Sequence, residues 1–350
     1  MRRLALLVAV TACGGSAPPP AAPQAEQAVD ETKAERGAKD LVHEVYEDIG
    51  HADTDSLLAL LSDPLIVFGP RRADALATRA DALVALKQHV DPKAKHKPEL
   101  RSGDLAVIAS PGGRSAWAYD VVDVAGQPVA LTAVLSNTGD VWLVTAAALA
   151  QTPPMRQVKA ELKQDAVVPP GMTGIAKVDP GARAAVDKFQ RGLATQQVWG
   201  DDLAMRSDAV VIGPSAGDLA RGKAEIKKLW KRRVKENVRE VAAGEITAGA
   251  TPDGELAWVS APVVKFDDLD EPLPLRVFLV FEKAGADWKL IALHESLALD
   301  APGAATALKK IAPPPEPKAE PAAPPKTADA PPRKKRHKKK KPPPEDDPPD

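Results

Sequence analysis

One order of predicted elements occurs twice along the chain, and this repeat limits the possible folds more than any other part of the sequence. In each half, two helices precede a short apolar strand, another helix follows, and strands separated by turn residues complete the pattern. Two copies are too few for a solenoid, so each copy is expected to have its own core. Five anchors recur in the same order, between 141 and 146 residues apart: Ser62-Asp63 with Ser207-Asp208, Gly69-Pro70 with Gly213-Pro214, Arg79–Ala82 with Arg221–Ala224, Ala116-Trp117 with Ala257-Trp258, and Trp142 with Trp288.

Helices followed by an antiparallel series of strands predict an α+β fold. We expect two tandem domains, 39–150 and 182–300, joined by a linker over 151–181. The first is predicted to contain helices near 41–50, 57–61 and 80–90, and strands at 64–68, 105–109, 116–124, 129–136 and 141–149. The second repeats this order, with helices around Val186–Leu193, Asp201–Met205 and Ala224–Val234 and a strand at Val210–Ile212.

The first residues have the pattern of a secretory signal: Met1-Arg2-Arg3, a short apolar run and small residues. Val10-Thr11-Ala12 before Cys13 resembles the lipobox of bacterial lipoproteins. That resemblance implies a signal peptide over 1–12 and lipidation of Cys13, which would anchor the chain in the cell envelope. The outer membrane, on its periplasmic side, is the expected location. Residues 13–38 are predicted to be a flexible tether. An ordinary buried thiol at the N-terminus of a cytosolic protein is the alternative.

The last fifty residues, 301–350, are predicted to be a disordered tail rich in proline and lysine. The formal net charge of −1 excludes a globally basic nucleic-acid binder, but this tail contains a local cationic block. Behind a secretion signal, its expected target is an anionic envelope polymer or lipid. A solvated tail without a target is the alternative. The block consists of Arg333, Lys334, Lys335, Arg336, Lys338, Lys339, Lys340 and Lys341.

Three segments of the second copy carry a family resemblance: Asp201–Asp208, Val210–Pro214 with Ala220–Ile226, and Trp288–Ser296. Together they resemble SnoaL-like domains of the nuclear-transport-factor-two-like superfamily, which also contains ketosteroid isomerase. The resemblance implies a cone: a curled, mostly antiparallel sheet on helices around an apolar pocket. It also implies a sheet face that makes dimers or packs tandem copies. Both tyrosines, Tyr46 and Tyr119, lie in the first copy, which weakens a direct analogy with ketosteroid isomerase.

The last predicted strand of the second copy contains the candidate site. Strict alternation would place Trp288, Leu290, Ala292, His294 and Ser296 on one face, as a pocket wall. His294 is the candidate general base, with Ser296 beside it, because the pKa of imidazole lies near working pH. A core histidine bonded to Ser296 or a backbone carbonyl is the alternative. Trp258, Trp288 and Leu290 are the candidate ligand contacts, with core filling as the alternative. The first copy has Ala148 and Ala150 at the two polar positions and is predicted to be degenerate.

No metal or cofactor site is predicted. The six histidines have no metal-ligand spacing, one cysteine cannot form a disulfide, and no phosphate-binding glycine loop occurs. These observations favour a lipoprotein that binds a small apolar molecule or acts as a scaffold, without nucleic acid. The alternative is an isomerase, dehydratase or hydrolase that acts on a small apolar carbonyl compound, with His294 as base.

Overall fold

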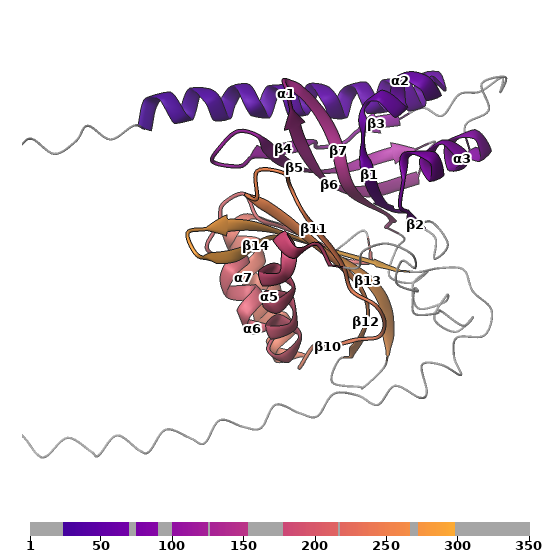
Figure 1. Ribbon diagram of the computed structural model, residues 1–350. Helices are drawn as coiled ribbons and strands as arrows, with labels where there is room; N and C mark the ends of the chain where they lie inside the picture. The colour runs from indigo at the N-terminus through magenta and orange to yellow at the C-terminus, as the bar shows by residue number, and fades with distance from the viewer. Residues whose placement is uncertain are drawn as a thin grey trace, which may run out of the picture. The chain divides into compact units, whose positions relative to one another are not determined.

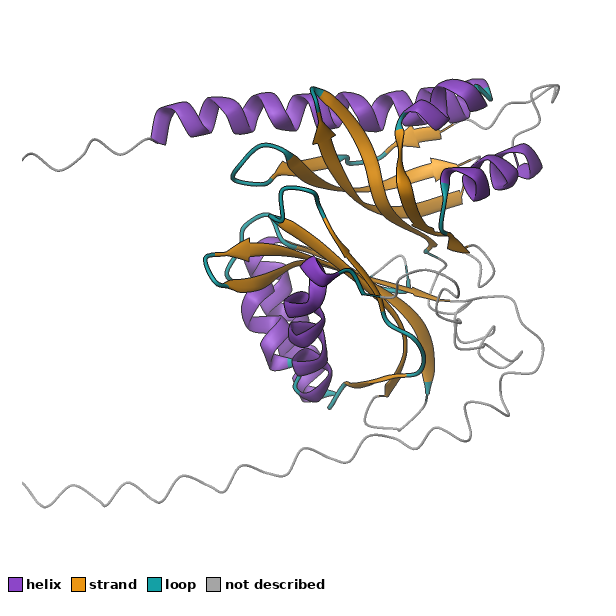
Figure 2. Cartoon of the chain, in the orientation of Figure 1, coloured by secondary structure: helices purple, strands orange, loops and turns teal. Residues whose placement is uncertain are grey.

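The computed structural model describes residues 24–69, 75–89, 100–124, 127–152, 178–215, 218–266 and 272–297. They form two seven-stranded sheets, each packed on helices of its own (Figures 1 and 2). The predicted α+β class, with curled and mostly antiparallel sheets, is therefore confirmed. The signal, Cys13, most of the linker and the proline- and lysine-rich tail lie outside the described residues.

The first sheet has the strand order β2-β1-β7-β6-β5-β3, and β4 also pairs with β5. All its strand pairs are antiparallel except β1 with β7. Its elements are α1 (Gln24–His51), α2 (Thr54–Ala59), β1 (Leu61–Phe68), β2 (Ala75–Leu76), α3 (Arg79–His89), β3 (Leu100–Ser102), β4 (Ala106–Ala109), β5 (Ser115–Val124), β6 (Gln127–Thr138) and β7 (Val141–Gln151).

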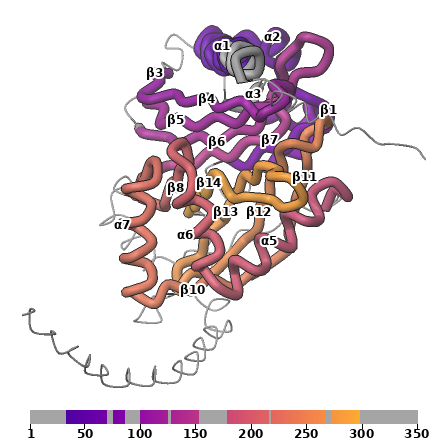
Figure 3. The backbone as a smooth tube through the Cα atoms, turned by 90° about the vertical axis from the view of Figure 1, so that its left-hand side faces the viewer, coloured from indigo at the N-terminus to yellow at the C-terminus, as the bar shows by residue number. Residues whose placement is uncertain are grey.

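The second sheet repeats this topology as β9-β8-β14-β13-β12-β10, with β11 also on β12 and one parallel pair, β8 with β14. Among its helices, α6 lies between α5 and α7 (Figure 3). The elements are η1 (Pro180–Ala182), α5 (Arg183–Ala194), α6 (Gln197–Leu203), β8 (Val210–Ile212), β9 (Leu219–Arg221), α7 (Gly222–Lys235), β10 (Arg239–Ala242), β11 (Thr247–Ala250), β12 (Leu256–Phe266), β13 (Leu273–Ala284) and β14 (Asp287–Leu297).

The N-terminal helix differs from the expected tether. It begins at Gln24, well before the expected domain start at residue 39. Ala34 and Ala38 are buried and lie on the same side as Leu41 and Val42, which belong to the first core. Small side chains thus let the helix pack closely one turn before the predicted boundary. The expectation of a flexible segment as far as residue 38 is wrong for this part of the chain.

Both sheets contain the same irregularity in their last strand pair. In β6 and β7 the register shifts between Val134 and Leu135, and in β13 and β14 it shifts between Val280 and Phe281. Each shift leaves one extra residue on the last strand, which is a β-bulge. Because bulges re-aim every side chain beyond them, the shared bulge gives the two sheets matching inward-facing positions.

The outer faces of the two sheets pack against each other within the chain. One buried cluster combines Trp117, Tyr119 and Val134 of the first sheet with Trp258 and Phe278 of the second. The Trp258 and Phe278 rings stack with centroids 5.9 Å apart, and Phe278 lies 6.4 Å from Phe68 of the first sheet. The face expected to make dimers or to pack tandem copies is therefore covered within one chain.

Candidate functional site

The bulge in β14 changes the face on which the predicted catalytic residues lie. Phe281 pairs with Leu290 and Val280 with Ala292, so Ile291 is the extra residue. Trp288 and Leu290 face the helices and belong to the second core, whereas Ala292 belongs to the cluster between the sheets. The expectation that His294 and Ser296 share a face with Trp288 is wrong, because one inserted residue reverses the alternation.

His294 lies between the two sheets rather than in a pocket of the second domain. Its side chain is 1% exposed, and its Nδ1 lies 3.1 Å from the hydroxyl oxygen of Thr132 on β6. Burial lowers the pKa of His294 to about 4, so the ring is neutral at pH 7. Ser296 donates its hydroxyl hydrogen to the backbone oxygen of Arg276 at 3.1 Å. This environment suits a hydrogen bond between sheets better than a base that must reach a substrate.

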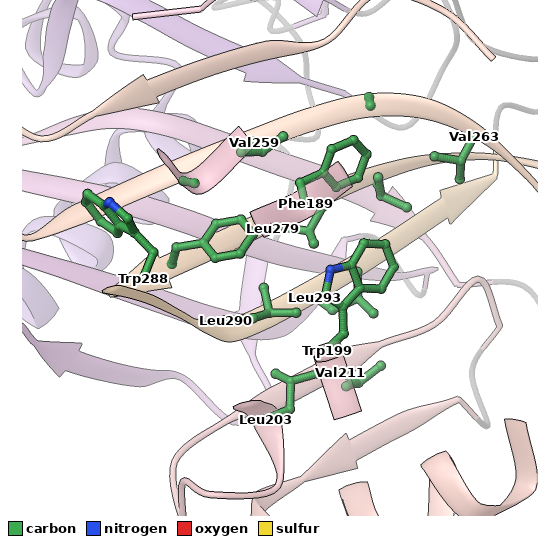
Figure 4. Close-up of a cluster of buried hydrophobic side chains, with 14 of the residues drawn as sticks. Phe189, Trp199, Leu203, Val211, Val259, Val263, Leu279, Trp288, Leu290 and Leu293 are labelled. Atoms are coloured by element: carbon green, nitrogen blue, oxygen red, sulfur yellow. The ribbon is translucent and has the colours of Figure 1, made fainter. Parts of the chain in front are cut away.

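The three predicted ligand contacts are all buried among other side chains. Trp258 stacks on Phe278 between the sheets. Trp288 and Leu290 lie in the second core, where Phe189 and Trp199 stack with centroids 5.8 Å apart (Figure 4). The Trp199 ring also occupies the space that a Cβ at Gly192 would need, which explains the glycine inside α5. Core filling thus accounts for the contacts of these aromatic residues.

A network of four charged side chains lies inside the second domain. Glu295, next to His294 but on the helix-facing side of β14, is fully buried. Its carboxylate accepts hydrogen bonds from Arg233 Nη2 at 2.5 Å and Lys265 Nζ at 3.0 Å. Glu240 Oε1 lies 3.6 Å from Arg233 Nη1, which is an ion-pair distance but too long for a hydrogen bond.

The pKa values of the two carboxylates in this network are shifted in opposite directions. Burial raises the pKa of Glu240 to about 7, and the nearby charge of Glu295 adds to this. Burial alone would also raise the pKa of Glu295, but Arg233 and Lys265 hold that pKa at about 2. The network is therefore stabilised around an ionised Glu295, and burial beside that charge favours the protonated form of Glu240.

The equivalent positions in the first sheet are apolar and surround a cavity. The shared register equates Glu240, Lys265 and Glu295 with Leu100, Val124 and Leu149. All three apolar residues line a cavity of about 360 Å³ between the first sheet and its helices. That volume lies at the lower end of the range for small-molecule sites.

The cavity exists because the first core contains few large side chains. Its fully buried members are alanine, valine and leucine residues, whereas the second core contains Phe189, Trp199 and Phe281. The shared bulge equates Leu279 and Phe281 with Ala133 and Leu135, both of which line the cavity. Interiors are otherwise close-packed, so the smaller side chains of the first core leave this space. The copy predicted to be degenerate therefore has room for a ligand.

One polar pair lies at the wall of this cavity. Tyr46 on α1 is the only described lining residue with a polar side-chain atom, and its hydroxyl donates to Asp120 Oδ2 at 3.2 Å. Asp120 on β5 is fully buried and also accepts from the Ser102 hydroxyl at 2.7 Å and the Asp104 backbone N–H at 2.9 Å. Three donors therefore satisfy the carboxylate without a cation.

Neither polar site was predicted, although the sequence contains a signal for each. Asp120 interrupts the otherwise apolar segment Ala116–Val122, and Glu295 comes soon after the apolar run Leu290–Leu293. A charged residue inside an apolar strand indicates a buried polar contact. The partners Tyr46 and Arg233 come from helices far away in sequence, so they could not be identified without the fold.

Other predicted sites concern segments that the structure does not describe. Cys13 and the basic block over 333–341 both lie outside the described residues. Within the described ranges, no group of three or more His, Cys, Asp or Glu residues could hold a metal ion. No helix of the described part has the length and apolar character needed to cross a membrane.

Comparisons with known proteins find a family match within the second half of the chain. Residues 186–300 match the model of the SnoaL-like domain family. A search of curated protein sequences finds no match to this chain.

Among solved structures, an NTF2-like protein of unknown function from Pseudomonas putida is 15% identical over 36% of this chain and 92% of its own, with a TM-score of 0.33. A dehydratase candidate of the NTF2-like family from Streptomyces avermitilis is 15% identical over 35% and 97%, with a TM-score of 0.30. An NTF2-like protein from Cytophaga hutchinsonii is 15% identical over 32% and 93%, with a TM-score of 0.28.

Proposed function

Because residues 186–300 form a SnoaL-like domain and the first sheet has the same strand order, we propose a protein with two domains of this kind that binds a small apolar molecule. The first domain holds the ligand, and the second supports it through the packed sheet faces. The cavity of about 360 Å³ in the first domain is the observation that carries this proposal.

A role in catalysis has less support from the geometry. The hydrogen bond of the predicted base, His294, goes to the hydroxyl of Thr132, and the ring is buried between the sheets. A general base needs to come within hydrogen-bonding reach of the substrate proton that it removes. An isomerase, dehydratase or hydrolase activity based on His294 therefore ranks second.

The binding function can be tested by filling the cavity with the residues of the second domain. The double variant Ala133→Leu with Leu135→Phe reproduces Leu279 and Phe281 at the matching positions. We expect the full chain to bind the neutral dye 1-naphthylamine with a change in its fluorescence, and the double variant to lose this binding. The conservative change Val84→Leu, at an exposed helix position, is the matched control. Equal dye binding by the double variant and the control would show that the cavity is not the site.

We further propose that acylated Cys13 anchors the chain in the cell envelope and that the basic block contacts an anionic envelope polymer or lipid. The lipobox-like sequence before Cys13 and the eight cations within 333–341 support this. Replacement of Cys13 by alanine should move the protein out of the membrane fraction. Retention there would contradict lipid anchoring. Binding to vesicles with anionic lipids should decrease as salt rises and should disappear when the eight cations are replaced by glutamine.

A further inference from the structure

The cavity of the first domain offers a ligand one hydrogen-bond acceptor and no donor from its described side chains. Tyr46 has the only polar side-chain atom among the described lining residues, and its hydroxyl hydrogen is directed to Asp120 at 3.2 Å. The phenolic oxygen keeps its lone pairs, so it can accept a further hydrogen bond. Burial and the charge of Asp120 raise the pKa of Tyr46, which keeps this phenol protonated.

The direction of the Tyr46 hydrogen bond is fixed by the other partners of Asp120. The Ser102 hydroxyl shares Oδ2 with Tyr46, and the Asp104 backbone N–H occupies Oδ1. A backbone N–H can only donate, and the carboxylate can only accept. Tyr46 is thus held as a donor toward Asp120. A hydrogen bond that donates to a carboxylate also makes the phenolic oxygen a stronger acceptor.

We propose that this cavity selects a neutral amphiphile with an apolar body and one polar group that donates a hydrogen bond, such as a hydroxyl, and that it rejects carboxylates of the same length. This inference rests on the proposed binding function and specifies its ligand class. At roughly 30 Å³ for each water-sized group, the cavity of about 360 Å³ has room for about a dozen non-hydrogen atoms.

Rejection of carboxylates follows from the same residues. An anionic headgroup at Tyr46 would find no donor there and would lie near the buried charge of Asp120. Burial of a charge without a partner is costly, and a like charge in a low-dielectric site adds to that cost. An acceptor-only headgroup, such as a ketone, avoids the charge penalty but gains no hydrogen bond.

The second domain has different side chains at the positions that form this site. Ala261 occupies the position that matches Asp120, because Asp120 pairs with Leu131 and Ala261 with Val277 in matching registers. The charged residues Glu240, Lys265 and Glu295 replace three apolar cavity residues. We therefore expect one ligand per chain, in the first domain.

The test compares three probes of equal chain length: 1-decanol, 2-decanone and decanoate. Calorimetric titration uses the full chain carrying Cys13→Ala, at pH 8. We expect 1-decanol to bind about tenfold more tightly than 2-decanone, the effect of one hydrogen bond. Decanoate should bind at least about a hundredfold more weakly than 1-decanol. If decanoate or 2-decanone binds as tightly as 1-decanol, the inference is wrong while the binding function stands. If neither neutral probe binds, the binding function itself fails.

A single substitution should remove the preference of the cavity for 1-decanol over 2-decanone. In Asp120→Asn, the amide nitrogen can donate to the Tyr46 oxygen, while the amide oxygen still accepts from Asp104 N–H. The Tyr46 hydrogen then becomes available to the ligand, so 2-decanone should bind at least as tightly as 1-decanol. Asp123→Asn removes an exposed charge from the same strand and should leave the probe ratio unchanged. A ratio that stays tenfold in Asp120→Asn would overturn the role of this pair. The ranking in the chain with native Asp120 tests the proposal even where the variant does not fold.

Discussion

A cavity lowers the free energy of unfolding of the domain that contains it. One substitution can measure this effect in the first domain. Ala133 lies on β6, is buried and lines the cavity, and the second domain has Leu279 at the matching position. Ala133→Leu adds three carbon atoms to a space of about 360 Å³. At about 0.8 kcal/mol for each buried carbon, the upper limit is about 2.4 kcal/mol. Loss of side-chain entropy and local adjustment reduce this, so we expect a gain of about 1–2 kcal/mol.

Equilibrium unfolding in urea, followed by far-ultraviolet circular dichroism, measures the change. The midpoint should rise while the slope stays constant, because the surface exposed on unfolding changes little. Ala130→Leu is the matched control: it lies on the same strand but faces the packed cluster between the sheets. Overpacking of that cluster in Ala130→Leu should lower the free energy of unfolding by about 1–3 kcal/mol. If Ala133→Leu destabilises the protein as much as Ala130→Leu does, the cavity does not provide space for the larger side chain.

Two further predictions concern the buried ionisable groups of the second domain. Glu295→Leu leaves Lys265 without the carboxylate that it bonds at 3.0 Å and should lower the free energy of unfolding in urea by about 3–5 kcal/mol. Combining Glu295→Leu with Arg233→Met, Glu240→Leu and Lys265→Val should restore most of the lost free energy of unfolding. A loss below about 1 kcal/mol in Glu295→Leu alone would contradict a coupled network. The pKa of His294 falls from 6.5 to about 4 on folding, so the unfolded state binds the proton first and stability decreases as pH falls from 6.5 toward 4. Relative to the His294→Asn variant, the free energy of unfolding of the native chain should fall by about 2 kcal/mol between pH 7.5 and pH 5. A difference in unfolding free energy that does not change with pH would argue against a buried neutral ring.

The position of each element was largely predictable because it depends on local patterning. Apolar spacing at Val186, Phe189 and Leu193 indicates the helix that the structure shows as α5. Turn residues at 111–113 separate β4 from β5, and Gly139 follows the last residue of β6 at the turn into β7. The start of α1 was not predictable in this way, because alanine-rich sequence before residue 39 carries only a weak apolar stripe. The burial of Ala34 and Ala38 depends on close packing of the helix against the first domain.

Strict alternation could not show on which face of the sheet the side chains of the last strand lie beyond the bulge. A bulge depends on how two strands pair, and Ile291 has no local feature that marks it as the extra residue. His294 was therefore predicted on the wrong face of β14. Its assignment to a pocket wall required an unbroken period of two, and one extra residue moved it to the contact between sheets.

Two α+β units with a repeated order of elements could be inferred from the amino-acid order, because apolar spacing and turn residues act over short distances along the chain. The positions of the cavity and of the charged network became clear from the folded chain. Both depend on side chains brought together from separate elements: Tyr46 with Asp120 in the first unit, and Arg233 with Glu295 in the second. Whether a core is filled depends on summed side-chain volumes around a closed space, which no local pattern records.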